Sequence, residues 1–232
     1  CWDIGCPGGP PLDNNFKVYM GSCQEVADET YRIMKSYIRP AMDGARSVGI
    51  PVFHVQDTTI ARKYPQYVKE PIKENVIFSP PPVSEHQIEI LERAHGRDYH
   101  NRSPLKDMDI PQIVAPKDEE PVVSETNQLD KILRERGILN IIYTGFATDL
   151  CILHAPGGSG PMLSLGYNCF LIREATLGSE FADTFDERLA TRWGLRFFET
   201  QRGHTIGFED FISSCERIRG DRKSTRLNSS HI

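Results

Sequence analysis

The sequence has no long apolar run and no block of basic residues. None of its hydrophobic segments approaches the roughly 18 residues that a membrane-spanning helix needs, and no secretory signal pattern opens the chain. The net charge is −5, so the positive surface that a nucleic-acid partner needs is missing as well. We therefore expect a cytoplasmic protein with no membrane or nucleic-acid partner.

Paired cysteines are also missing. The six cysteines form no CxxC pair and no metal-binding pattern with the histidines, which argues against a structural zinc site and against a disulfide framework. This distribution fits a reducing compartment.

The chain has 232 residues, of which 39% are hydrophobic, and this is enough for one domain with a real core. We expect a single domain over residues 1–220, with a long polar and proline-bearing excursion at 60–110. Residues 221–232 resemble the translation of a sequencing adapter, and we interpret them as a non-native tail.

Short β-branched runs alternate with longer amphipathic stretches along the body of the chain. The pattern predicts strands at 50–55, 110–114, 139–144, 167–172 and 195–199. It predicts helices at 22–48, 84–94 and 124–137, from 149 onward, and at 181–193 and 208–218. Ser22 is the predicted cap of the first helix, and Pro40 should interrupt it. Strands separated by such helices indicate a parallel sheet that is covered on both faces. The predicted fold is α/β, a three-layer α/β/α domain with a mainly parallel, Rossmann-like central sheet.

Three reactive side chains fall at predicted strand ends. Asp3 closes a first short strand, Lys117 follows the strand that ends at Val114, and Cys151 follows the turn after Thr144. Ligands of open parallel sheets bind beyond the carboxyl ends of the strands. An acid, a cation and a thiol at neighbouring strand ends form a chemically coherent set.

The setting of Cys151 favours a thiolate. Thr148 or Asp149 is the predicted helix cap, which places the cysteine in the first turn of a helix, where free N–H groups favour negative charge. Lys117 would add to this effect, Asp3 would carry the proton, and the N–H groups of Ala147 and Cys151 would hold an oxyanion. Each residue also has a plainer interpretation: a buried inert cysteine, a capping aspartate, a solvated lysine.

The stretch Gly145-Phe-Ala-Thr-Asp-Leu-Cys151, followed by Leu165-Gly-Tyr167 and Arg173-Glu-Ala-Thr176, resembles the isochorismatase-like cysteine hydrolases. That family includes nicotinamidases, N-carbamoylsarcosine amidase and ureidoacrylate amidase. The resemblance implies a catalytic triad of Asp3, Lys117 and Cys151, a cis peptide between Phe146 and Ala147, and a homo-oligomer.

The sequence departs from the family at three places. The frequent Asp-x-Gln pattern after the first strand reads Asp3-Ile-Gly here. Nicotinamidases carry a metal site of Asp-x-His-x-x-His type, but here Asp57-Thr-Thr-Ile-Ala lacks both histidines, so we expect no metal and no cofactor. After the cysteine, His154-Ala-Pro-Gly-Gly-Ser-Gly-Pro161 is longer than the usual family spacing, and Pro156 with its neighbouring glycines should interrupt the helix.

These observations predict a cysteine hydrolase that cleaves a C–N bond of a small non-peptide amide or carbamoyl/ureido compound through a thioester, with water as the second substrate. Trp2, Phe146 and His154 are candidate pocket residues. Two alternatives stay open: a catalytically silent scaffold that binds a ligand or partner protein, and a thiol redox protein.

Overall fold

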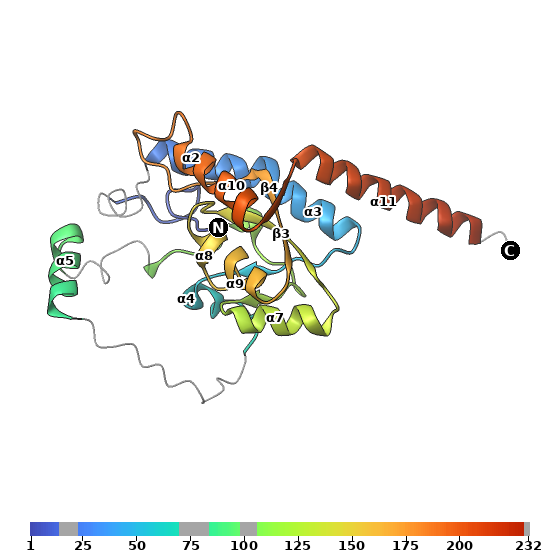
Figure 1. Cartoon of the computed structure of the whole chain (residues 1–232), viewed down its shortest axis with the longest axis horizontal. Coiled ribbons are helices and arrows are strands. Elements are labelled where there is room, and N and C mark those ends of the chain that lie inside the picture. The colour runs from blue at the N-terminus through green and yellow to red at the C-terminus, as the bar shows by residue number, and fades with distance from the viewer. Residues whose placement is uncertain (14–22, 70–83, 98–105, 230–232) are drawn as a thin grey trace.

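The computed structural model describes residues 1–13, 23–69, 84–97 and 106–229 (Figure 1). Its strands are β1 (His54–Val55), β2 (Val122–Val123), β3 (Asn140–Phe146), β4 (Asn168–Leu177) and β5 (Gly203–Ile206). Every strand pair is parallel, which confirms the predicted α/β class with a parallel sheet. The strands form two separate sheets, however, with the orders β1-β2 and β3-β4-β5.

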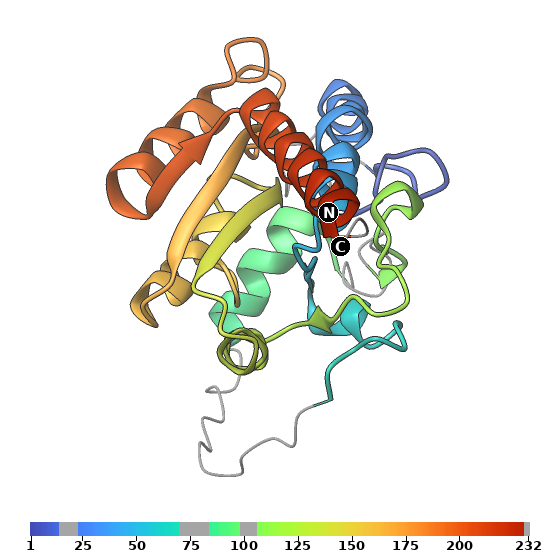
Figure 2. The ribbon, with the colours of Figure 1, turned by 90° about the vertical axis from the view of Figure 1, so that its right-hand side faces the viewer.

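Helices cover both faces of the larger sheet. The helical segments α2 (Gln24–Ile33), η1 (Met34–Ile38), α3 (Arg39–Ser47) and α11 (Phe208–Ser229) lie on one face, and α7 (Thr126–Glu135), α8 (Cys151–His154), α9 (Ser159–Ser164) and α10 (Leu189–Gln201) on the other. Figure 2 shows α11 with the α2–α3 segment on one side of β4 and α10 on the opposite side.

The alternation of β4 explains the two cores between these layers. Cys169 and Leu171 point into the core that includes Phe198, whereas Ile172 belongs to the core of the α2–α3 face. Successive side chains of a strand point to opposite faces, so the apolar run at 169–172 of this strand is covered on both sides.

The first long helix changes its hydrogen bonding at Pro40. Pro40 lies in the first turn of α3, directly after the π-helical segment η1, and the N–H of Arg39 donates to Met34 O. Proline has no N–H to give to the helix, which explains the predicted interruption at this position. The predicted cap Ser22 lies outside the described residues.

The excursion at 60–110 contains the predicted helix. It is α5 (Glu85–His95), and Ser84 and Gln87 form a reciprocal capping box at its start. The other short helix near this excursion is α4 (Thr58–Ala61), which Asp57 caps by accepting a hydrogen bond from Thr59 N. In the part of the chain that the structure describes, no helix has the length and apolar character to cross a membrane.

Three predicted strands are wrong: the short first strand that Asp3 was to close, and the strands at 110–114 and 195–199. Residues 110–114 contain the 3₁₀ turn η3 (Gln112–Val114) after Pro111, because proline gives the chain no N–H for a sheet ladder. Residues 195–199 are part of α10, and the predicted helix at 181–193 is shifted to Leu189–Gln201.

Candidate active site

The turn before Cys151 begins at the carboxyl end of β3. The peptide between Phe146 and Ala147 is cis, as the family resemblance predicts. The carbonyl of Ala147 accepts hydrogen bonds from the N–H groups of Leu150 (3.2 Å) and Ile152 (3.1 Å), and this closes the chain into a tight turn that leads into α8. As predicted, the helix is interrupted after His154, and α9 begins only at Ser159.

Thr148 and Asp149 hold this turn from the opposite side and do not cap the helix. Thr148 is fully buried, its N–H donates to Leu177 O, and its hydroxyl lies 2.7 Å from that of Thr176. Asp149 Oδ1 accepts a hydrogen bond from Ser179 N at 2.8 Å. The predicted cap is therefore wrong: Leu150 occupies the N-cap position without a side-chain hydrogen bond. The side chain of Thr148 instead bonds Thr176 of β4, and that of Asp149 bonds Ser179 just after β4.

Helix α10 packs directly onto the turn. A Cβ at Gly194 would lie 2.9 Å from both Asp149 N and the carbonyl carbon of Thr148, so only glycine allows this approach. Gly194 is therefore the point at which α10 touches the turn.

Cys151 is exposed at the start of α8, and two backbone N–H groups near it lack partners. Among the described residues, the N–H groups of Ala147 and Cys151 have no hydrogen-bond acceptor. Such free N–H groups close to a thiol can stabilise an oxyanion that forms on a carbonyl attacked by the sulfur.

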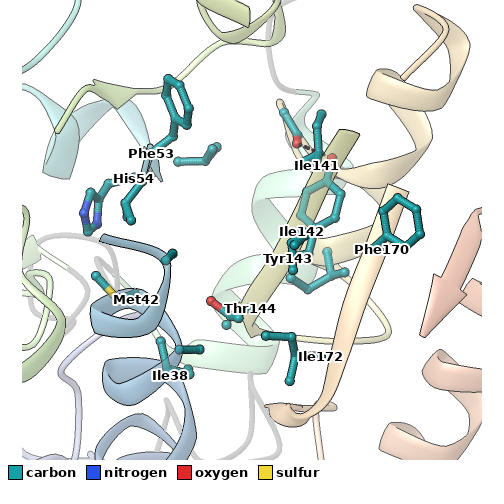
Figure 3. A pocket seen from close by; sticks show the side chains of 18 of the residues that line it. Ile38, Met42, Phe53, His54, Ile141, Ile142, Tyr143, Thr144, Phe170 and Ile172 are labelled. Carbon is teal, nitrogen blue, oxygen red and sulfur yellow. Dashed lines mark hydrogen bonds between the residues drawn. The ribbon is translucent and has the colours of Figure 1, made fainter. Parts of the chain in front are cut away.

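A cleft of about 740 Å³ opens beside the cysteine. Its walls include Phe53 and His54 on one side and Ile141 to Thr144 of β3 on the other (Figure 3). Cys1, Phe146 and Cys151 line the same space, and we call it the central cleft. Of the predicted site residues, the structure thus brings Cys151 and Phe146 together here.

Asp3 does not line the central cleft. Its Oδ1 accepts a hydrogen bond from Asp109 N (2.8 Å), and its own N–H donates to Asp109 O (3.0 Å). The carbonyl of Asp3 is covered by Gly9, where a Cβ would come within 2.0 Å. Residues 1–3 belong to no strand, so the predicted first strand is wrong. Asp3 nevertheless lies only two positions after Cys1, which lines the cleft.

Lys117 faces α3 and also does not line the cleft. Its Nζ lies 3.4 Å from Asp43 Oδ1, and the side chains of the lysine and the aspartate are 55% and 43% exposed. Burial tends to raise the pKa of Asp43, but hydrogen bonds from Arg39 and Arg46, with Lys117 nearby, hold it at about 2.

A buried polar cluster fixes the loop that carries Lys117. Glu120 accepts from Arg46 at 2.6 and 2.8 Å, lies 3.0 Å from His54 Nε2, and accepts from Lys117 N at 2.9 Å. Burial opposes ionisation of Glu120, but these hydrogen bonds hold its pKa at about 2. Burial lowers the pKa of His54, against the effect of Glu120.

The other two candidate pocket residues lie away from the cleft. Trp2 packs against the core of the α2–α3 face. His154 is exposed on α8, and its ring centroid lies 6.4 Å from that of Phe197 on α10. Neither side chain lines the central cleft.

The family model for the isochorismatase domain matches residues 14–191 of the chain. The chain belongs to the isochorismatase family. A cysteine hydrolase from Pseudomonas syringae pv. phaseolicola 1448A has a similar fold, with a TM-score of 0.54 and 14% identity over 86% of this chain and 89% of that one. A putative isochorismatase from Burkholderia xenovorans LB400 has a TM-score of 0.48, with 16% identity over 86% of both chains.

The isochorismatase family is a family of hydrolases with an α/β fold, and this chain is one of its members. Among the residues that the structure describes, no group of three His, Cys, Asp or Glu side chains could hold a metal ion. Asp57, the first residue of the segment that lacks the two histidines of the nicotinamidase metal motif, caps α4.

Sequence reasoning missed the buried carboxylate of Glu180. It is fully buried and accepts hydrogen bonds from Thr191 N (2.8 Å), Thr191 Oγ1 (2.7 Å), Thr184 Oγ1 (2.7 Å) and Ala190 N (3.3 Å). Burial opposes ionisation, but these donors lower the pKa of Glu180. Glu180 thus accepts hydrogen bonds from N–H groups in the first turn of α10. The sequence predicted a helix that begins at 181, so it did not place Glu180 beside the true start of α10.

Proposed function

We propose that this member of the isochorismatase family is a cysteine hydrolase that cleaves a C–N bond of a small non-peptide amide or carbamoyl/ureido compound. The observation that carries the proposal is Cys151: an exposed thiol after the turn that follows the carboxyl end of β3, with the free backbone N–H groups of Ala147 and Cys151 in that turn. Active sites of open parallel sheets lie at this edge.

Asp3 takes the proton of the Cys151 thiol, the resulting thiolate attacks the carbonyl carbon of the amide, and the N–H groups of Ala147 and Cys151 bind the oxyanion. The C–N bond then breaks, and the amine leaves with the proton that Asp3 took from the thiol. Water gives a proton to Asp3 as it attacks the thioester, the C–S bond breaks, and Asp3 passes that proton to the sulfur as the acid is released.

Lys117 is the proposed electrostatic partner of the thiolate. This role requires its ammonium group to leave Asp43. An ion pair between two half-exposed side chains is worth about 0–1 kcal/mol, so a bound anionic group can readily compete for the lysine.

Alkylation with iodoacetamide tests the nucleophile. Burial raises the pKa of Cys6 to about 11, and it also raises the pKa of Cys169 and Cys215, so these thiols react slowly at neutral pH. We expect Cys151 to be alkylated well below pH 8 and at least about tenfold faster than the other cysteines. An inert Cys151 in the folded protein contradicts the proposal.

Ammonia release from small amides, ureido acids and carbamoyl amino acids identifies the substrate. Cys151→Ala should abolish turnover of any compound found, while the folded state stays intact by circular dichroism. Cys23→Ala, at a half-buried cysteine far along the sequence from the turn, is the matched control and should retain turnover.

A ligand-binding scaffold without catalysis is the second candidate. The observation that favours it is that Lys117 does not line the cleft and is paired with Asp43 instead. A scaffold would bind an amide without releasing ammonia, and Cys151→Ala would leave that affinity unchanged. A thiol redox protein would instead form a reversible disulfide at Cys151.

A further inference from the structure

Asp3 is held in place by Asp109, which lies 106 positions later in the chain. The N–H of Asp109 donates to Asp3 Oδ1 (2.8 Å), and the N–H of Asp3 donates to the carbonyl of Asp109 (3.0 Å). Residues 1–3 belong to no strand, so no sheet ladder fixes the direction of this side chain. The orientation of the Asp3 carboxylate therefore depends on the segment that carries Asp109.

One oxygen of the Asp3 carboxylate stays open. In the part of the chain that the structure describes, Oδ1 accepts the N–H of Asp109, whereas Oδ2 accepts no hydrogen bond. A hydrogen bond to one oxygen fixes the plane of a carboxylate, and the other oxygen can then exchange a proton. The contact with Asp109 thus leaves Asp3 both oriented and able to act as a base.

The side chain of Asp109 is itself anchored. Its Oδ1 accepts hydrogen bonds from the N–H of Ile110 (2.7 Å) and from the hydroxyl group of Tyr64 (2.7 Å). The flanking residues Met108 and Ile110 are buried in the core of the α2–α3 face, and Tyr64 packs against the same core. Asp109 is thus fixed through its side chain and through both of its neighbours, which holds its N–H in the direction of Asp3.

Tyr64 is a hydrogen-bond donor at neutral pH. Burial raises the pKa of its phenol, and the hydrogen bond to Asp109 acts in the same direction. An ionised carboxylate only accepts hydrogen bonds, so the phenol supplies the proton of this contact. The bond from Tyr64 to Asp109 therefore persists over the pH range in which a thiol and a carboxylate exchange a proton.

Lys63, the neighbour of Tyr64, adds a weaker contact to the same segment. Its ammonium group donates to Met108 O (2.7 Å) and lies 3.6 Å from Asp109 Oδ2. The side chains of Lys63 and Asp109 are 39% and 37% exposed, and ion pairs between side chains this exposed contribute little. Tyr64 is therefore the main support of the Asp109 side chain.

We propose that Asp109, held by the hydroxyl group of Tyr64, is a positioning residue for Asp3. The role rests on the proposed function, in which Asp3 takes the proton of the Cys151 thiol. A displacement of about 1 Å in a reacting group can cost about 100-fold in rate, so such a support matters for the reaction. Neither Tyr64 nor Asp109 lines the central cleft, so their effect on the reaction passes through Asp3.

Alkylation of Cys151 by iodoacetamide at neutral pH tests the proposal without a known substrate. The sulfur displaces iodide and the thiol proton passes to Asp3, so the rate reports on this base, and Asp3→Asn should lower it. Asp109→Ala removes the acceptor of two hydrogen bonds and Tyr64→Phe removes one donor, and each should slow alkylation about tenfold. Tyr31→Phe, at a tyrosine that packs against the same core, is the control and should leave the rate unchanged.

Asp109→Asn is the rescue variant, because its amide oxygen can accept the same two hydrogen bonds without the charge. Its alkylation rate should stay within about threefold of the wild-type rate. Hydrogen exchange at the amide of residue 109 should accelerate about tenfold in Tyr64→Phe, which checks the link between the phenol and the N–H that Asp3 accepts.

A second set of variants carries Asp3→Asn in addition. If Asp109 and Tyr64 act through Asp3, Asp109→Ala and Tyr64→Phe should have no further effect on alkylation in that background. A general loosening of the structure would slow alkylation in both backgrounds. Where Asp109→Ala fails to fold, Tyr64→Phe carries the same test, because it removes only one hydroxyl group.

The possible failures are distinguishable. Wild-type rates for Tyr64→Phe and Asp109→Ala, with a low rate for Asp3→Asn, would overturn the positioning role and leave the proposed function intact. Equal slowing in both backgrounds, equal slowing by Asp109→Asn and Asp109→Ala, or unchanged exchange at residue 109 would overturn it as well. A wild-type rate for Asp3→Asn would contradict the proposed function of Asp3 itself, and the positioning role with it.

Discussion

Thr148 and Thr176 place their hydroxyl groups 2.7 Å apart in the buried contact that ties the turn before Cys151 to β4. Thr176 Oγ1 donates to Gly145 O, also at 2.7 Å, so Thr148 is the donor to Thr176. The chain leading to the cysteine is thus fixed on both sides of the Phe146–Ala147 peptide by one hydroxyl group of the neighbouring strand.

Thr176→Val should lower the free energy of unfolding by about 1–3 kcal/mol, because it leaves Gly145 O and the Thr148 hydroxyl buried without a partner. Urea unfolding measures the change. Thr200→Val, at an exposed helix position whose hydroxyl bonds only its own helix, is the control. An equal effect of both substitutions would contradict the importance of this contact.

Glu120 should make the protein sensitive to acid. Its pKa is about 2 in the folded state and about 4.3 in an unfolded chain, so its stabilisation is present above pH 4.3 and is lost as the pH falls toward 2. Urea unfolding at a series of pH values between 6 and 2 measures the loss. Glu120→Gln should be less stable at pH 6 and should show a flatter dependence below pH 4.3; an unchanged slope would show that other carboxylates dominate.

Lys117→Met separates stability from catalysis. The ion pair with Asp43 is partly exposed, so the free energy of unfolding should change by less than about 1 kcal/mol. If Lys117 acts on the Cys151 thiolate, the alkylation rate and the turnover should nevertheless fall, by about tenfold or more. Lys35→Met, at an exposed position of η1, should change neither quantity. Unchanged alkylation in the Lys117 variant would remove the lysine from the proposed site.

Glu180→Ala should destabilise the protein by about 2 kcal/mol or more, because it leaves the N–H and hydroxyl of Thr191 without their buried acceptor. Hydrogen exchange at the amides of Ala190 and Thr191 should accelerate first, since these form the start of α10. Glu187→Ala, at an exposed position one residue before Arg188, serves as the control. Protection that stays unchanged would show that α10 does not need this carboxylate.

The sequence predicted the parts of the fold that depend on local pattern. Periodicity and proline predicted a helix at 124–137, a strand at 139–144 and an interruption after His154. The structure has the helix at Thr126–Glu135, the strand at Asn140–Phe146 and the end of α8 at His154. The family resemblance predicted the cis peptide.

The predictions that were wrong are those in which tertiary contacts override the local sequence pattern. The run at 195–199 looked like a short strand, but Thr191, Gly194 and Phe198 are buried at helical spacing, and short apolar runs fit either structure. Gly194 is required by the backbone of the turn that it touches, which no local pattern shows. The placement of Lys117 beside Asp43 likewise depends on Glu120 and Arg46, which are 74 residues apart in the chain.

The close approach of Gly194 to the backbone of Thr148 and Asp149 has a spectroscopic consequence. Trp193, the neighbour of Gly194, is 53% exposed and stacks on Phe197 with 5.3 Å between ring centroids. Because one of the two tryptophans of the chain is thus anchored next to the turn that carries the thiol, its emission should act as a built-in reporter for whatever binds at Cys151.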